Sequence, residues 1–150
     1  MAAEKIAILH YSHKHGDDLI PVILKKGLPK INNRLLSKLG VWEPELERED
    51  EFAEWYDPVE IEEIPTLAGP RDWTPRTVPR KEMLLTIISL YDHRSGLYAI
   101  PVLVPKGTKE LPEITKELLE TLDAEDFDLE NEDNVAGWTT SGILKTLNRV

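Results

Sequence analysis

The sequence has 150 residues, of which 41% are hydrophobic and 31% are charged, and its formal net charge is −10 at neutral pH. This composition is typical of a folded chain with one ordinary domain or two small lobes, and it excludes a disordered protein. The negative charge is repelled by nucleic-acid phosphates and by anionic membranes, so we expect neither as a direct partner. The absence of cysteine excludes disulfides, thiolate zinc sites and cysteine nucleophiles.

Apolar runs along the chain are short. The longest, residues 83–91, is interrupted by Thr86 and Ser89 and falls well below the ~20 residues of a membrane span. The apolar stretch within residues 1–15 is too short for a signal peptide. We therefore expect a cytoplasmic protein.

The first elements predicted along the chain are a β-hairpin and a helix. Residues 6–11 and 19–24 are apolar and β-branched, as in strands, and Gly16 suits the turn between them. Pro29 suits a first helical position, and Gly40 suits the helix end. The helix should bury one apolar stripe. Its members are Ile31, Leu35, Leu36 and Leu39.

A third strand, a short helix and a linker are expected next. The strand, or a small hairpin in its place, should run through residues 46–55, and Asp57-Pro58 should cap the short helix. Residues 65–82 contain four prolines and have no apolar period, which predicts an extended, semi-rigid linker.

The same order of elements is predicted again after the linker. Strands are expected at 84–91 and 98–104, a helix from Pro112, and a third strand within 127–138. The second helix should bury a matching stripe. Its members are Ile114, Leu118, Leu119 and Leu122. Thr140 or Ser141 should cap a short closing helix.

The two halves align with one gap. At an offset of 80, Tyr11 matches Tyr91 and His13 matches His93; after three inserted residues the offset is 83, and Trp55 matches Trp138. We infer an α+β fold made by internal tandem duplication of a ββαβα unit, each a small antiparallel sheet with a packed helix, related by a pseudo-two-fold axis. The lobes are 1–64 and 83–150. The protein is then a monomer with pseudo-dimeric lobes or a homodimer.

Both halves also carry an acidic run. Residues 43–63 and 110–133 each contain eleven acids and one base. A solvated face explains this, but a basic protein partner would also fit it, and imitation of nucleic acid is a special case of that reading. The predicted partner-binding residues are Glu43, Glu45, Glu47, Glu49, Asp50, Glu125, Asp126, Asp128, Glu130 and Asp133.

A histidine cluster lies at the first turn. The sequence His-Lys-His-Gly-Asp-Asp at 13–18 resembles the first metal motif of metallo-β-lactamase-fold hydrolases, H-x-H-x-D-H. The resemblance implies a metal held by His13, His15 and Asp17, which would activate a water molecule. Asp18 stands where that family has a third histidine, and the second copy keeps His93 without the other ligands. We therefore favour a capped hairpin turn and no metal site, with a small metal-dependent hydrolase as the alternative.

The sequence contains no other pattern that indicates catalysis. There is no glycine-rich phosphate loop and no Gly-x-Ser-x-Gly elbow, and no carboxylate pair stands out as acid and base. We assign no catalytic residue and no cofactor. The favoured interpretation is a non-catalytic binding or regulatory protein that acts through protein–protein interaction.

Overall fold

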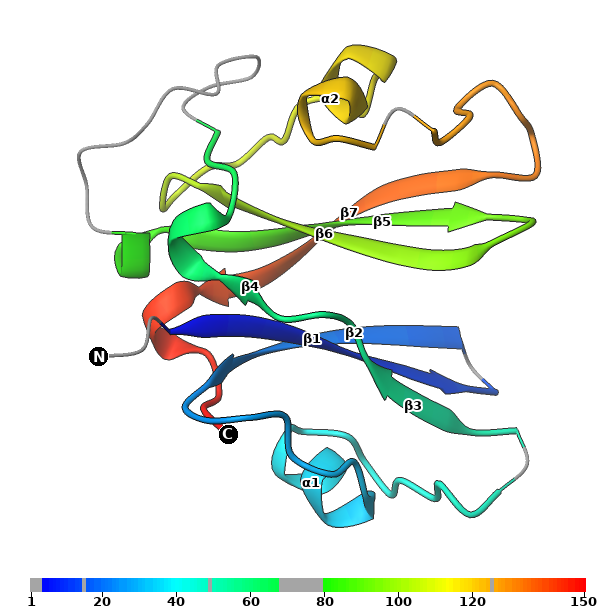
Figure 1. Cartoon of the computed structure of the whole chain (residues 1–150), viewed down its shortest axis with the longest axis vertical. Helices are drawn as coiled ribbons and strands as arrows, with labels where there is room; N and C mark the ends of the chain where they lie inside the picture. The colour runs from blue at the N-terminus through cyan, green and yellow to red at the C-terminus, as the bar shows by residue number, and fades with distance from the viewer. Residues whose placement is uncertain (1–3, 15, 49, 68–79, 125) are drawn as a thin grey trace. The chain divides into compact units, whose positions relative to one another are not determined.

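The chain forms two compact units, Met1–Ile61 with Leu147–Val150, and Glu62–Thr146 (Figure 1). The computed structural model describes residues 4–14, 16–48, 50–67, 80–124 and 126–150. Each unit contains an antiparallel sheet and a short helix, which confirms the predicted α+β class. Within the described residues, the helices are all too short or too polar to cross a bilayer.

The sheet of the first unit is built around a tight hairpin. Strand β1 (Lys5–His13) pairs with β2 (Gly16–Leu24), and Gly16 adopts a φ of 130° at the turn. On its other side β1 pairs with β3 (Phe52–Trp55) and then with the two-residue β4 (Val59–Glu60). Successive side chains of β1 point to opposite faces of the sheet, so Ala7, Leu9 and Tyr11 share one side, which faces the core.

Helix α1 (Asn33–Lys38) packs against this side but begins later than predicted. Asn32 caps it by accepting a hydrogen bond from Leu35 N at 2.8 Å. Pro29 lies before the helix, and its carbonyl oxygen accepts a hydrogen bond from Trp55 Nε1 at 2.9 Å. The prediction that the whole stripe is buried is confirmed in part: two of its leucines are buried, whereas Ile31 and Leu35 pack against the same cluster but remain partly exposed. The buried members are Leu36 and Leu39.

The second unit repeats this order. Its sheet is β6 (Gly96–Val104), β5 (Leu84–Asp92) and β7 (Val135–Ile143), preceded by the 3-10 helix η2 (Arg80–Glu82). Thr115 caps helix α2 (Lys116–Thr121), so Pro112 again precedes the helix. Trp138 Nε1 donates to Pro112 O at 2.8 Å. In this stripe Leu118 and Leu119 are the buried members.

The short closing helices form, but their predicted caps are wrong. The 3-10 helices η1 (Ile61–Glu63) and η3 (Leu144–Thr146) follow the last strands directly. Asp57 therefore lies between β3 and β4, and Thr140 and Ser141 lie inside β7. Apolar Ile61 and Leu144, both buried, place the turns instead of a polar cap.

Two short segments, residues 65–67 and 148–150, pair in parallel beside the outer strands of the two sheets. In the first unit, Arg149 bridges in parallel to Ile23, and Ile23 N donates to Asn148 O at 2.8 Å. In the second, Thr66 bridges in parallel to Leu103, and Leu67 N donates to Leu103 O at 2.8 Å. The second unit thus includes residues 62–64, predicted in the first lobe, and residues 65–67, predicted in the linker. The first unit includes residues 147–150, predicted in the second lobe. Linker residues 68–79 lie outside the described part of the chain.

Strand register corrects the predicted alignment of the first strands by one residue. Trp55 pairs with Leu9, and Trp138 pairs with Ile88, so the position of Tyr11 corresponds to Leu90. Tyr11 is 4% exposed, whereas Tyr91 is 47% exposed. The cause is turn length: two residues separate His13 from its partner Gly16, and three separate Asp92 from Gly96.

Candidate functional site

The first acidic loop connects α1 to β3. Leu46 packs against the core, and its backbone N donates to Asn33 Oδ1 at 2.9 Å. Arg48 lies 3.5 Å from both Glu45 and Asp50, so two of these carboxylates are partly neutralised. All described predicted partner-binding residues of the loop are exposed, and Glu49 lies outside the described residues. The exposed ones are Glu43, Glu45, Glu47 and Asp50.

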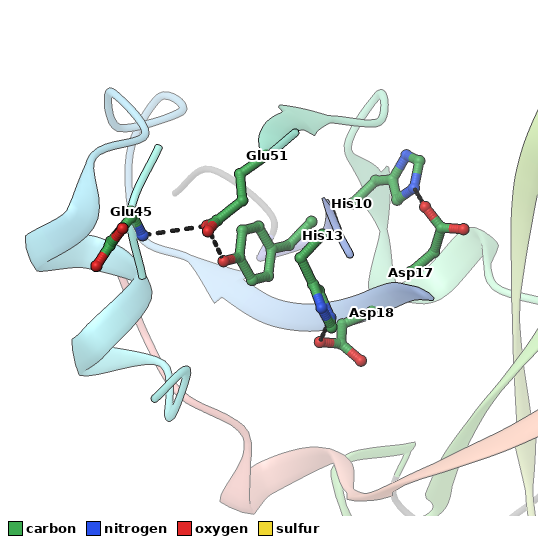
Figure 2. Close-up of polar contacts among 7 residues, drawn as sticks. His10, His13, Asp17, Asp18, Glu45 and Glu51 are labelled. Carbon is green, nitrogen blue, oxygen red and sulfur yellow. Dashed lines mark hydrogen bonds and ion pairs between the residues drawn. The ribbon is translucent and has the colours of Figure 1, made fainter. Parts of the chain in front are cut away.

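Glu51 closes this loop onto the sheet. Its Oε1 atom accepts hydrogen bonds from the hydroxyl of Tyr11 and from Glu45 N, the latter at 3.1 Å (Figure 2). Burial, then the hydrogen bond and charge of Glu51, raise the pKa of Tyr11 to about 12. The same hydrogen bond lowers the pKa of the Glu51 carboxyl below its usual value. Glu51 is therefore part of the loop anchor, whereas its neighbours face solvent.

We expect one tyrosine to titrate near pH 12, and we expect this titration to be missing in the Tyr11→Phe variant. The ordinary pKa is 10.0 and the folded value is higher, so the neutral phenol stabilises the fold fully below pH 10, and this contribution is lost between 10 and about 12. Phenolate absorbance against pH, compared between the two proteins, measures this. Glu51→Gln should lower the Tyr11 pKa while leaving it above 10, because burial remains. Identical titrations for wild type and Tyr11→Phe would contradict the assignment.

The second acidic loop connects α2 to β7 and is held by its own amides and carboxylates. Asp128 Oδ1 accepts from Glu130 N at 3.0 Å, and Asn131 Oδ1 accepts from Asp133 N at 2.9 Å. Asn134 binds Asp128 O through its side-chain nitrogen at 2.9 Å and accepts from His93 N at 3.1 Å. These bonds tie the loop to the β5–β6 turn.

Carboxylates of the second loop face solvent in the same way. Phe127 and Leu129 pack against the core, so the alternating acids between and beyond them point outward. The exposed predicted residues are Asp126, Asp128, Glu130 and Asp133, and Glu125 lies outside the described residues. From 122 to 134 the sequence has no basic residue, so the loop lacks a counterpart of Arg48.

The histidine cluster separates into two pairs in the first hairpin. His13 Nε2 lies 2.9 Å from Asp18 Oδ2, and His10 Nε2 lies 2.8 Å from Asp17 Oδ1 (Figure 2). Asp17 is the ladder partner of Ser12, so it shares a side of the sheet with His10, whereas Asp18 pairs with Tyr11 on the opposite side. His13 and Asp17, predicted as co-ligands in the hydrolase alternative, therefore point to opposite sides. The third, His15, lies outside the described residues.

His10 is the polar residue that sequence reasoning missed. It is 7% exposed, it stacks on Tyr56 at a ring-centroid distance of 5.8 Å, and Phe52 meets it edge-on at 5.5 Å. Its Nδ1 atom is buried, forms no hydrogen bond to a described residue, and lies 3.7 Å from Glu54 Oε1. The hydrogen bond from His10 lowers the pKa of Asp17. A lone histidine in an apolar strand is the only signal that the sequence offers for this site.

Among the described residues, no group of three histidine or acidic side chains could hold a metal ion. The two histidine–carboxylate pairs each hold one strand to the next, while the acidic loops carry the exposed charge. No family model matches the chain, and no match is found among curated proteins or solved structures.

Proposed function

We propose that the chain is a tandem duplication whose two acidic loops form the binding surface for a basic protein partner. The observation that carries the functional part is the same loop in both units: apolar side chains pack inward and carboxylates face solvent. Dense exposed negative charge speeds the encounter with a positively charged surface.

Equivalent details 83 residues apart support the duplication. The helix caps are Asn32 and Thr115, and the closing 3-10 helices begin at Ile61 and Leu144. Each unit uses a tryptophan from its third strand to bind the carbonyl 26 residues earlier, just before the helix. A shared side-chain hydrogen bond at the same spacing supports common descent of the two units.

The exchanged ends support the pseudo-two-fold relation. Residues 65–67 extend the sheet of the second unit, and residues 148–150, 83 positions later, extend that of the first. Reciprocal exchange of equivalent segments is what a swapped homodimer becomes when its two chains are fused.

The binding proposal is tested with a fluorescent peptide of alternating lysine and arginine and with variants of the full chain. Changing Glu43, Glu47, Asp126 and Glu132 to their amides should weaken binding about tenfold or more and mainly slow association, because steering is lost. Among the described residues, these four side chains have no hydrogen-bond or ion-pair partner whose loss would be confused with loop unfolding. Binding should also weaken steeply as salt rises.

The matched control makes changes of the same type outside the loops. Glu62→Gln and Glu63→Gln, both exposed in η1, are combined with the conservative exchanges Glu113→Gln and Asp57→Asn, so that net charge changes equally. Equal loss in both sets would show that only net charge matters, and the acidic loops would then be solvating surfaces. Imitation of nucleic acid is the special case in which the partner is a nucleic-acid-binding protein. In that case DNA should compete with this chain for binding to the partner.

A further inference from the structure

Strand β7 is an outer strand of the second sheet, and one of its edges has no strand partner among the described residues. It pairs with β5 on one side, and no described strand pairs with its other side. Alternate backbone N–H and C=O groups of such a strand point away from the sheet. With nine residues, β7 offers a long row of these groups.

Over residues 135–140, the open edge lacks the features that usually block pairing. Residues 134–144 contain no charged residue and no proline, in a chain in which 31% of residues are charged. Thr139 and Thr140 are exposed at the middle of the strand. The pairing register of β7 shifts opposite Leu85 and Thr86. This shift disturbs the C-terminal part of the strand and leaves the pairing of residues 135–140 regular. Natural edge strands are normally short, charged, bulged or interrupted by proline.

The corresponding edge of the first unit is blocked in these ways. There the strand is divided into β3, of four residues, and β4, of two. Asp57 and Pro58 separate the two pieces, and Glu54 and Glu60 add charge within them. Corresponding edges of the two units therefore differ, and of these two described edges that of β7 is the one suited to pairing.

We propose that β7 pairs antiparallel with β7 of a second copy of this chain, which joins the two second-unit sheets across a two-fold axis. Charge supports this occupant and orientation. Acidic residues precede β7, and Lys145, which lies 3.8 Å from Glu82 of its own chain, follows it. Antiparallel self-pairing therefore places the acidic end of each strand beside Lys145 of the other copy. Parallel pairing would bring two acidic loops together. The inference does not rest on the proposed function.

The dimer is tested on the full chain by light scattering and sedimentation over a wide concentration range. One strand pair buries less area than a standard interface, so we expect a dissociation constant that is roughly micromolar or weaker. Thr139→Lys or Thr140→Lys should raise it by roughly tenfold or more, because like charges then meet across the pair. Ser37→Lys, which adds the same charge at an exposed position of α1, should leave it unchanged.

Hydrogen exchange gives a second readout that locates the contact. Amides within residues 135–140 should become more protected as concentration rises, whereas those of β3 should not. A chain that stays monomeric to millimolar concentration overturns the proposal. So does a dimer that is insensitive to both lysine variants, or a monomer whose β7 amides are protected only by an added extended peptide, because the occupant would then not be a second copy.

Discussion

Replacing Leu36 with alanine is expected to lower the free energy of unfolding by about 2–5 kcal/mol. Leu36 is 0% exposed on α1 and packs against the β1 and β2 side chains of the first core cluster. The helix has only six residues, so its own hydrogen bonds stabilise it weakly and its attachment depends on this packing. Leu119→Ala should cost a similar amount in the second unit, where Leu119 is 1% exposed. Denaturant unfolding measures both values.

The control for these variants is Leu28→Ala. Leu28 is 43% exposed, so the same truncation should change stability by much less, on the order of 0.5 kcal/mol. A cost for Leu36→Ala as small as that of Leu28→Ala would show that the helix does not pack on the sheet. Because the units are separate compact bodies, we expect each core variant to affect mainly the hydrogen exchange of its own unit.

Local patterns in the sequence predicted most of the elements. Apolar, β-branched runs with a glycine between them predicted both hairpins, and the leucine stripes predicted both helices, because each signal lies within a few residues. The predicted helix starts, at Pro29 and Pro112, were too early. Asn32 and Thr115 are strong N-capping residues, and the helices begin directly after them. The extra residue in the β5–β6 turn shifted the alignment, since two tyrosines, at 11 and 91, matched by letter but not by register.

The candidate site was predicted less completely than the fold. The exposure of the acidic side chains could be predicted from their number and spacing, because a run of carboxylates must face water. Those among the described residues are exposed in the two loops. His10 could not be assigned, because its bond to Asp17 depends on which residue the ladder places beside it. A shift by one residue would send Asp17 to the opposite side of the sheet. The exchange of chain ends was not predictable either, since nothing local specifies a partner over 100 residues away.

Removing residues 147–150 is expected to destabilise the first unit by about 3–5 kcal/mol. Three backbone hydrogen bonds join this segment to β2 and the residue after it, with Ile23 and Lys25 as donors and Val150 N donating to Ile23 O. Each is worth about 1 kcal/mol net, because the Ile23 and Lys25 amides exchange a backbone acceptor for water when the segment is removed. Val150 also packs against the first core, and Arg149 pairs with Glu4 at 2.6 Å. Thermal or denaturant unfolding of the chain ending at residue 146 gives the total.

Hydrogen exchange separates this local effect from general loss of stability. In the shortened chain the amides of Ile23 and Lys25 should exchange much faster, whereas that of Leu103, bonded to Pro65 O in the second unit, should change little. Asn148→Ala is the matched control, because its side chain is exposed and the backbone bonds remain. If the shortened chain unfolds at the same denaturant concentration as Asn148→Ala, residues 147–150 do not stabilise the first unit. If instead the amides of both units lose protection from exchange together, the two units unfold cooperatively. The segment then stabilises the whole chain by stabilising the first unit.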